Sequence, residues 1–167
     1  MLAIIPARSG SKGLRNKNIL NLKKLPLIAH TILAAKKSKK ISKVVVITDS
    51  KKISKIAKKY GAEVPFIRPK KLSTDSSKVI DTYFYTLKFF EKKNFFYKEF
   101  IALLPTAPLR DYKDIDTAID IFKKNNAKSV ISVTKQKKPI EWNLLIDKKK
   151  KIRSFFKPTL KNSQAFK

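Results

Sequence analysis

The chain of 167 residues contains no cysteine, one histidine and one methionine. Without cysteine, neither a disulfide nor a thiolate metal site can form, and the composition is compatible with a reducing compartment. The N-terminus lacks the long apolar core of a signal peptide, and no apolar run approaches the length needed to span a membrane. We therefore expect a cytoplasmic protein without a membrane partner.

Acidic residues are also scarce, because 12 Asp and Glu stand against 40 Lys and Arg, which gives a net charge of +28. Such a charge ordinarily favours a nucleic-acid or anionic-membrane partner. Only five of these cations are arginine, whereas nucleic-acid surfaces use arginine for bidentate contacts. The lysines are scattered over every expected helix surface, so we interpret them as a compositional bias. We expect nonspecific binding to nucleic acid at low salt, but no specific nucleic-acid partner.

The residues that are present favour a folded chain with a core of its own. Hydrophobic residues make up 43% of the sequence, and the length suits one domain. Stretches with the periodicity of strands and helices alternate. Strands are expected at 2–6, 43–48, 63–67, 100–104 and 129–133, and helices at 26–37, 51–60, 78–92 and 114–125. This order predicts a single domain over residues 1–167, an α/β fold of three layers with a mainly parallel sheet.

The stretch from Ile4 to Asn18, IIPARSGSKGLRNKN, has the features of an anion-binding loop. An apolar strand end leads into small residues that are interleaved with cations. Small residues let backbone N–H groups approach an anion closely, and the hydroxyl and cationic side chains suit a polyphosphate. The glycine spacing fits neither the Walker loop nor the dinucleotide fingerprint. A nucleoside triphosphate site is the functional interpretation, and a basic turn between a strand and a helix is the alternative.

Two other segments follow later strands in the same way. Arg68 and Pro69 come after the expected strand 63–67, and PTAPLR comes after the strand 100–104. In parallel sheets, ligands bind beyond the carboxyl ends of the strands. We therefore expect the loop, Arg68 and PTAPLR to converge on one cleft.

Together these residues resemble the CMP-sialic acid synthetases, also called acylneuraminate cytidylyltransferases. The matching segments are IIPARSGSKGLRNKN, VVVITDS with KISKIAKKYGAEVPFIRP, and LLPTAPLR, in the order that the family has them. The resemblance implies a Rossmann-like nucleotidyltransferase fold, CTP as donor, a sialic-type 2-keto sugar acid as acceptor and a magnesium requirement. Such an enzyme transfers CMP to the sugar acid and releases pyrophosphate. PTAPLR favours N-acetylneuraminate or a legionaminate-like acid over pseudaminate.

The resemblance also implies roles for individual residues. Phosphoryl transfer of this kind needs alignment and charge neutralisation rather than a nucleophile, so Arg8 and Lys12 are the catalytic candidates. The nucleotide-binding residues that the resemblance implies are Arg8, Ser9, Gly10, Ser11, Lys12, Lys17 and Asn18. The substrate-binding residues that it implies are Arg68, Asp75, Thr106, Arg110 and Gln164.

Some of these residues have structural interpretations as well. An ion pair at a strand end would account for Arg68, a helix cap for Asp75, and an exposed cation beside an aspartate for Arg110. Asp49 either approaches the nucleotide or metal, or only terminates its strand.

Other conspicuous residues are expected to be structural. His30 belongs to the apolar helix 26–37, where we expect it to pack rather than to act in catalysis. Trp142 and four phenylalanines are expected in the core or at an interface. These phenylalanines are Phe89, Phe90, Phe95 and Phe96.

The sequence departs from the family pattern in three places. Leu104 stands where glutamine is usual, and Val79 stands where serine is common, which leaves the acceptor specificity open. Family members continue past Gln164 into an Asn-Gly segment, a dimerisation region and an Asp-x-Asp pair that holds magnesium, whereas this chain ends at Lys167. We therefore assign no metal ligands, and we expect a truncated member with weak or no turnover alone and a homodimer at full length. A basic nucleic-acid-binding protein and a non-catalytic remnant of the enzyme are the alternative functions.

Overall fold

The computed structural model describes residues 1–10, 13–74, 77–135, 144–146 and 150–154. The chain divides into two compact units, Met1–Val130 and Ile131–Lys167. In the second unit, the strands β6 (Leu144–Ile146) and β7 (Ile152–Ser154) pair in an antiparallel hairpin. No helix in the described residues is long and apolar enough to cross a membrane.

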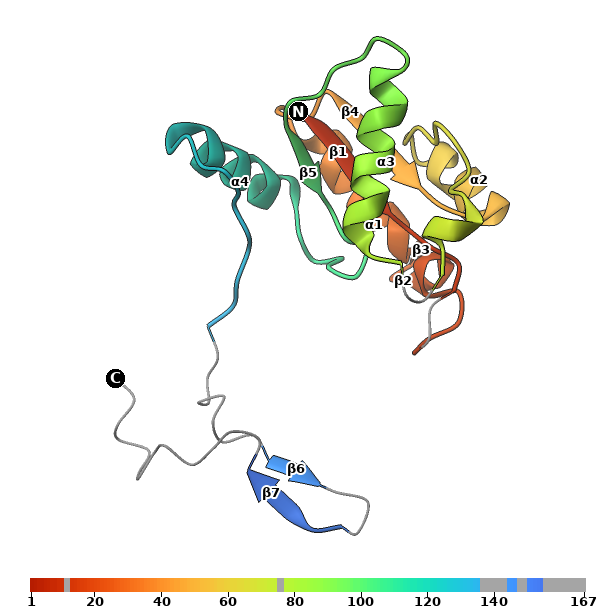
Figure 1. The fold of residues 1–167 in the computed structure, drawn as a ribbon, viewed down its shortest axis with the longest axis vertical. Helices are drawn as coiled ribbons and strands as arrows, with labels where there is room; N and C mark the ends of the chain where they lie inside the picture. The colour runs from red at the N-terminus through yellow and green to blue at the C-terminus, as the bar shows by residue number, and fades with distance from the viewer. Residues whose placement is uncertain (11–12, 75–76, 136–143, 147–149, 155–167) are drawn as a thin grey trace. The chain divides into compact units, whose positions relative to one another are not determined.

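A parallel sheet with strand order β4-β1-β5 forms the centre of the first unit (Figure 1). Its strands are β1 (Leu2–Pro6), β4 (Lys43–Ile47) and β5 (Phe100–Ala102). β1 is paired on both sides, and its apolar run is buried on both faces. Continuous apolar strands of this kind are expected where helices cover both faces of a sheet.

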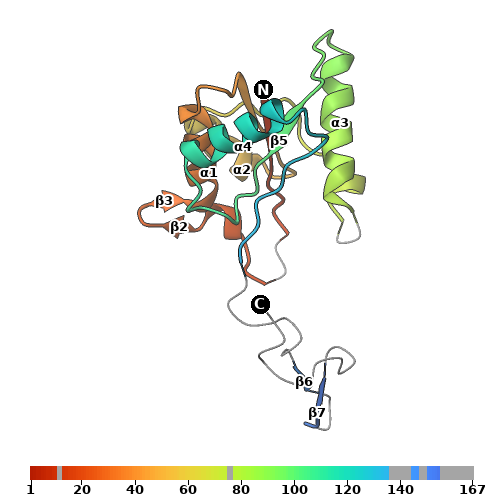
Figure 2. The ribbon, with the colours of Figure 1, turned by 90° about the vertical axis from the view of Figure 1, so that its left-hand side faces the viewer.

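Helices cover the two faces of this sheet, as Figure 2 shows, with α3 on one side and α1 and α4 on the other. α1 spans Leu27–Lys37, α2 spans Lys51–Lys59, α3 spans Val79–Glu91 and α4 spans Tyr112–Lys124. α2 ends as its sequence predicts, because Gly61 adopts a φ of 87° just beyond the C-cap Tyr60. The predicted three-layer α/β architecture is therefore confirmed.

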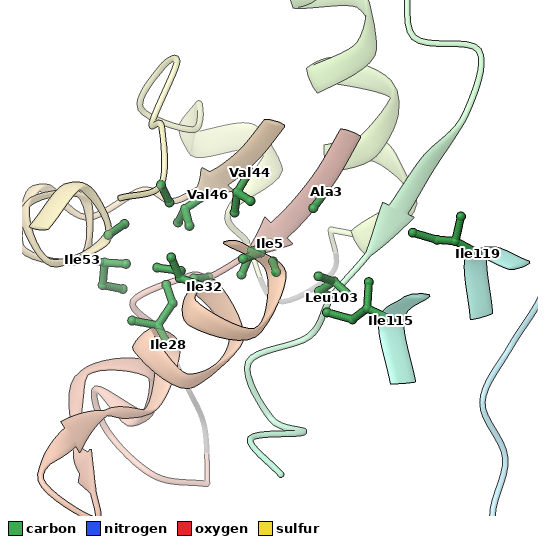
Figure 3. Close-up of a cluster of buried hydrophobic side chains, with 14 residues drawn as sticks. Ala3, Ile5, Ile28, Ile32, Val44, Val46, Ile53, Leu103, Ile115 and Ile119 are labelled. Atoms are coloured by element: carbon green, nitrogen blue, oxygen red, sulfur yellow. The ribbon is translucent and has the colours of Figure 1, made fainter. Parts of the chain in front are cut away.

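The core on the first face lies between the sheet and the helices α1, α2 and α4 (Figure 3). Ile28 and Ile32 are one helical turn apart on α1 and are both fully buried. They belong to a cluster with Ile5 and Val46 of the sheet and with Ile115 of α4. Residues from five elements thus belong to one core, and this shared packing holds the ends of the connecting loops in place.

The core on the second face is smaller and involves α3. Alternate residues of β1 and β4, such as Ile4 and Val45, are fully buried there. They belong to a cluster with Tyr83 and Phe90 of α3, whose side chains are 8% and 4% exposed.

The chain between β1 and α1 contains short elements that the sequence did not indicate. These are the 3-10 helix η1 (Lys17–Ile19) and a hairpin of β2 (Asn21–Leu22) and β3 (Leu25–Pro26). The two residues of the hairpin turn, Lys23 and Lys24, both have positive φ, as a type I′ turn requires.

Two expected strands are corrected by the structure. The segment 63–67 makes only two single parallel bridges, Val45 with Glu63 and Thr48 with Ile67. Pro65 lies between these bridges and has no N–H group to donate to a continuous ladder. The segment 129–133 forms no strand, since Ile131 and Val133 are 79% and 83% exposed and no described strand pairs with it.

Candidate functional site

The loop predicted to bind an anion leaves the carboxyl end of the central strand. β1 and β4 run in parallel register with Pro6 opposite Ile47, and the N–H group of Ala7 continues this pairing by donating to the Ile47 carbonyl oxygen at 2.9 Å. Arg8 and Ser9 follow and are half-buried. The start of the loop is therefore fixed by the most buried strand of the sheet.

Side chains from two other segments hold the start of this loop. The buried Asn18 donates from Nδ2 to the carbonyl oxygen of Arg8 at 3.0 Å. Asp49, which follows β4, accepts from Ser9 twice: Oδ1 accepts the backbone N–H at 2.8 Å, and Oδ2 accepts the hydroxyl at 3.0 Å. The sequence left the role of Asp49 open, and the structure places it against the loop.

A cleft of about 240 Å³ lies beside the loop. It brings together Arg8 after β1, Arg68 after the 63–67 segment and Leu104 after β5. Its other described lining residues are Pro6, Leu72, Thr74, Ser77, Lys78, Val79 and Thr82. The described lining thus offers three cations and three hydroxyls and contains no carboxylate, which suits an anionic ligand. The expected convergence holds for the loop, through Arg8, and for Arg68, whereas no residue of PTAPLR belongs to the described lining.

Arg68 is the most deeply buried cation of this cleft, with 7% of its surface exposed. Its Nε donates to the Ser73 hydroxyl at 3.0 Å, and its Nη1 donates to the Thr82 hydroxyl at 3.5 Å. Burial lowers the pKa of the guanidinium, nearby Asp49 opposes this shift, and the positive charge of Arg8 reinforces it. Arg68 forms no ion pair with any described residue, so the alternative interpretation, a structural ion pair at a strand end, finds no support in that part of the chain.

The PTAPLR segment lies outside the described lining of the cleft. Leu104, which precedes it, lines the cleft, but neither Thr106 nor Arg110 does. Thr106 is exposed. Arg110 instead turns toward α1, where its Nη2 donates to the Thr31 hydroxyl at 3.4 Å and to the Leu104 carbonyl oxygen at 3.3 Å. Burial lowers the pKa of Arg110, and Asp114 opposes that shift.

The structure describes only some of the remaining predicted site residues. Gly10 is exposed, and a Cβ added there would meet no atom within 4 Å, so its backbone is accessible. Lys17 is half-buried in η1. Four predicted site residues lie outside the described residues: Ser11, Lys12, Asp75 and Gln164.

Sequence reasoning did not select Lys78 or Thr82 for the cleft. Both lie at the start of α3, where the sequence shows only an amphipathic helix, so no local signal distinguishes them. Val79, a departure from the family pattern, lines the cleft as well, as does the other departure, Leu104.

Conspicuous residues away from the cleft have structural contacts. His30 lies with Nε2 at 2.8 Å from the Leu22 carbonyl oxygen and so ties α1 to the small hairpin. Phe89 packs against Phe66 and Phe90, whereas Phe95 and Phe96 are 54% and 72% exposed. Trp142 lies outside the described residues.

The described residues do not provide a magnesium site. Nowhere among them do three or more histidine, aspartate or glutamate side chains gather in a way that could hold a metal ion. The carboxylate nearest the loop, Asp49, already accepts two hydrogen bonds from Ser9. A divalent ion prefers several oxygen ligands, so these residues do not fit the ion that the resemblance implies.

Comparisons with known proteins agree with this geometry. The chain is 44% identical over 147 residues to CMP-N,N'-diacetyllegionaminic acid synthase of Legionella pneumophila, covering 88% of this chain and 63% of the relative. It is 42% identical over 140 residues to N-acylneuraminate cytidylyltransferase of Escherichia coli, covering 83% of this chain and 32% of that relative. The chain therefore spans less than two thirds of the length of these relatives.

The fold has a similar counterpart among solved structures. The structure of CMP:2-keto-3-deoxy-manno-octonic acid synthetase complexed with CTP superimposes with a TM-score of 0.60 at 21% identity, covering 75% of this chain and 48% of that one. Residues 2–153 match the family model described as Cytidylyltransferase. The resemblance to the CMP-sialic acid synthetases is thus confirmed, and the chain belongs to the cytidylyltransferase family.

Proposed function

We propose that this chain is the nucleotide-binding part of an enzyme that transfers CMP from CTP to a sialic-type 2-keto sugar acid and releases pyrophosphate. The observation that carries the proposal is that Arg8 and Arg68 line one cleft at the carboxyl ends of the sheet, without a described acidic residue in its lining. The relatives named for CMP-legionaminic acid synthesis and for N-acylneuraminate cytidylyl transfer support this choice of reaction.

In the proposed reaction, the anomeric hydroxyl of the sugar attacks the α-phosphorus of CTP, and pyrophosphate leaves. The protein aligns the two reactants and neutralises the charge that moves onto the leaving phosphates. Arg8 and Lys12 perform this neutralisation, with Gly10, Ser11, Lys17 and backbone N–H groups of the loop beside them. The open space at Gly10 and the half-buried position of Lys17 support this assignment.

The acceptor side of the proposal rests on residues beyond the first loop. Arg68 is preorganised by two hydroxyl groups and can pair with either a phosphate or the sugar carboxylate. Thr106 and Arg110 reach the acceptor only if the PTAPLR segment turns away from α1, where Arg110 now bonds Thr31. Asp75 and Gln164 remain part of this proposed set.

Three further properties belong to the proposal. Magnesium is implied by the family, and its ligands are not found among the described residues. A homodimer is expected of the full-length enzyme, and the cytoplasm is the compartment in which CTP is available. The acceptor is N-acetylneuraminate or a legionaminate-like acid.

Isothermal titration calorimetry at moderate salt tests the nucleotide part directly. We expect binding of CTP and at least about tenfold weaker binding of ATP, because a site for one base leaves polar groups unpaired with another. The paired control is Lys55→Met, which removes a cation from an exposed position of α2 and should leave CTP binding unchanged. A basic nucleic-acid-binding protein would instead show no preference for CTP and a steep salt dependence.

The acceptor is tested by pyrophosphate release from CTP in a panel of 2-keto sugar acids, with and without magnesium. We expect release with N-acetylneuraminate or legionaminate and little with pseudaminate, from a chain that extends over the full length of the relatives. Release that is independent of any sugar acid would overturn the proposed reaction.

A further inference from the structure

Ser9 has no donor left for a ligand in this structure. A serine offers one backbone N–H and one hydroxyl hydrogen. Both are directed at the carboxylate of Asp49, at 2.8 Å and 3.0 Å, although Ser9 and Asp49 are 40 residues apart in the sequence. Each of the two carboxylate oxygens accepts one of the two hydrogen bonds, so both donors of Ser9 have an acceptor in Asp49.

The strand register explains how Asp49 reaches the loop. β1 and β4 are adjacent and parallel, with Pro6 opposite Ile47, so the residues two or three positions beyond each strand end leave the sheet side by side. The backbone around Asp49 is itself held in place. The Thr48 carbonyl oxygen accepts from the Arg68 N–H at 2.8 Å, and the Thr48 hydroxyl accepts from the Ser50 N–H at 3.1 Å.

The opposite side of the loop start is held by Asn18, which donates to the Arg8 carbonyl oxygen. The peptide group between Arg8 and Ser9 is therefore hydrogen-bonded to Asn18 through its oxygen and to Asp49 through its N–H group. The side chain of Arg8 lines the cleft. The Asp49 carboxylate is directed at Ser9, and Asp49 is not among the described residues that line the cleft.

We propose that Asp49 is a positioning residue of the nucleotide-binding loop, and that Ser9 is the anchor through which it acts rather than a ligand of the phosphates. Asp49 fixes the direction in which Arg8 leaves β1, so that the guanidinium faces the cleft before CTP arrives. This inference rests on the proposed function for its ligand. The anchor itself is a property of the free chain and can be measured without nucleotide.

The first experiment measures amide hydrogen exchange by NMR in the nucleotide-free chain. The Ser9 amide should exchange at least about tenfold faster in Asp49→Ala than in the unsubstituted chain, because its acceptor is lost. The Ala7 amide, bonded to Ile47 on the adjacent strand, is the internal control and should stay protected. Asp49→Asn keeps an oxygen acceptor for the Ser9 N–H and should restore protection. Unchanged Ser9 exchange in Asp49→Ala would overturn the anchor.

The second experiment is a double-mutant cycle on CTP affinity with Asp49→Ala, Ser9→Ala and the double variant. We expect Asp49→Ala to weaken CTP binding by about tenfold, and the double variant to bind no more weakly than Asp49→Ala, because both changes break one pair. Cytidine affinity should change less than about twofold, since cytidine lacks the phosphates that Arg8 meets. Asp81→Ala removes the same charge from an exposed position of α3 and should leave CTP affinity unchanged.

Different results would overturn the proposed function and the proposed roles of Asp49 and Ser9. Additive losses from Ser9→Ala and Asp49→Ala would show that Ser9 contacts the nucleotide on its own and would overturn its role as an anchor. Equal losses for CTP and cytidine would overturn the positioning of Arg8. Absence of CTP binding in the unsubstituted chain would overturn the proposed function, and the exchange of the Ser9 amide would still decide the anchor.

Discussion

At the scale of single residues, Arg68 is costly for the fold and useful for binding. A guanidinium that is 7% exposed and hydrogen-bonds two hydroxyl groups loses much of its hydration. Burial lowers its pKa, and nearby Asp49 opposes this shift without outweighing it. An incoming phosphate or carboxylate would add a direct ion-pair partner.

Replacing Arg68 by methionine should therefore separate stability from binding. We expect CTP affinity to fall by at least about tenfold, the value of a lost charge-assisted hydrogen bond, while the free energy of unfolding stays the same or rises. Urea denaturation and calorimetry measure the two quantities, and Lys55→Met on the surface of α2 is the charge-matched control. A large loss of stability with unchanged CTP affinity would show that Arg68 serves the fold alone.

Tyr83 makes stability depend on pH in the alkaline range. Its side chain is 8% exposed and packs 5.4 Å from the ring of Phe100, and burial raises the pKa of its hydroxyl above the usual value of 10.0. The unfolded chain ionises first as pH rises, so the contribution of Tyr83 is present below pH 10.0 and is lost through its higher folded pKa. The unfolding free energy of the unsubstituted chain should fall relative to that of Tyr83→Phe as pH rises from about 9 to 11, because phenylalanine does not ionise. A difference that does not vary with pH would contradict this assignment.

The sequence predicted that residues after different parallel strands would converge, and Arg8 and Arg68 do line one cleft. The PTAPLR segment, which was expected to join them, contributes no residue to the described lining. Asp49 was left open, because nothing near it in the sequence shows that its partner is Ser9, 40 residues away. Hydrogen bonds between segments depend on the register, which local patterns do not determine.

At the scale of elements, the start of α4 shows how a cap selects a helix boundary. The sequence predicted a start at Asp114, but α4 begins at Tyr112 because Asp111 caps it. The Asp111 carboxylate accepts from the N–H groups of Lys113 at 2.8 Å and Asp114 at 3.1 Å, and Asp114 accepts in return from the Asp111 N–H at 3.0 Å. Either aspartate is a good cap by composition, and only the reciprocal pair distinguishes them.

Asp111→Ala should lower the free energy of unfolding by about 1 kcal/mol, because two N–H groups lose their acceptor. Urea denaturation measures the loss. Thr117→Ala, at an exposed position within α4, should be neutral or slightly stabilising, since alanine has the higher helix propensity. Equal effects of the two substitutions would show that the capping box does not stabilise α4.

All four expected helices form, whereas two of the five expected strands do not. β1, β4 and β5 occur where apolar runs were expected: most residues of β1 and β4 are buried, and β5, which is partly exposed, pairs with β1. The runs 63–67 and 129–133 have strand composition too, but the first makes only two bridges and the second lies exposed. A strand needs a neighbour as well as a suitable composition, so composition alone overestimates strands.

At the scale of the whole molecule, the buried residues of the two cores that the structure describes all lie within the first 119 residues. Every residue of the two buried clusters belongs to the unit Met1–Val130, and α4 supplies the last of them, Ile115 and Ile119. Both faces of the sheet are covered within this unit. The charged residues that produce the net charge of +28 are spread over the whole sequence, and none of them belongs to either cluster.

A chain that ends at Val130 should therefore fold alone and unfold cooperatively. We expect its thermal midpoint to lie within about 4 °C of that of the 167-residue chain, which corresponds to a change of about 1 kcal/mol. A chain that ends at Arg110 lacks α4 and leaves Leu103 uncovered, so it should lose at least about 2 kcal/mol, the cost of removing one large buried side chain. Circular dichroism during heating compares the three chains. If the chain ending at Val130 melts as early as the shorter one, residues beyond 130 are needed to stabilise the sheet, and the first unit is not independent.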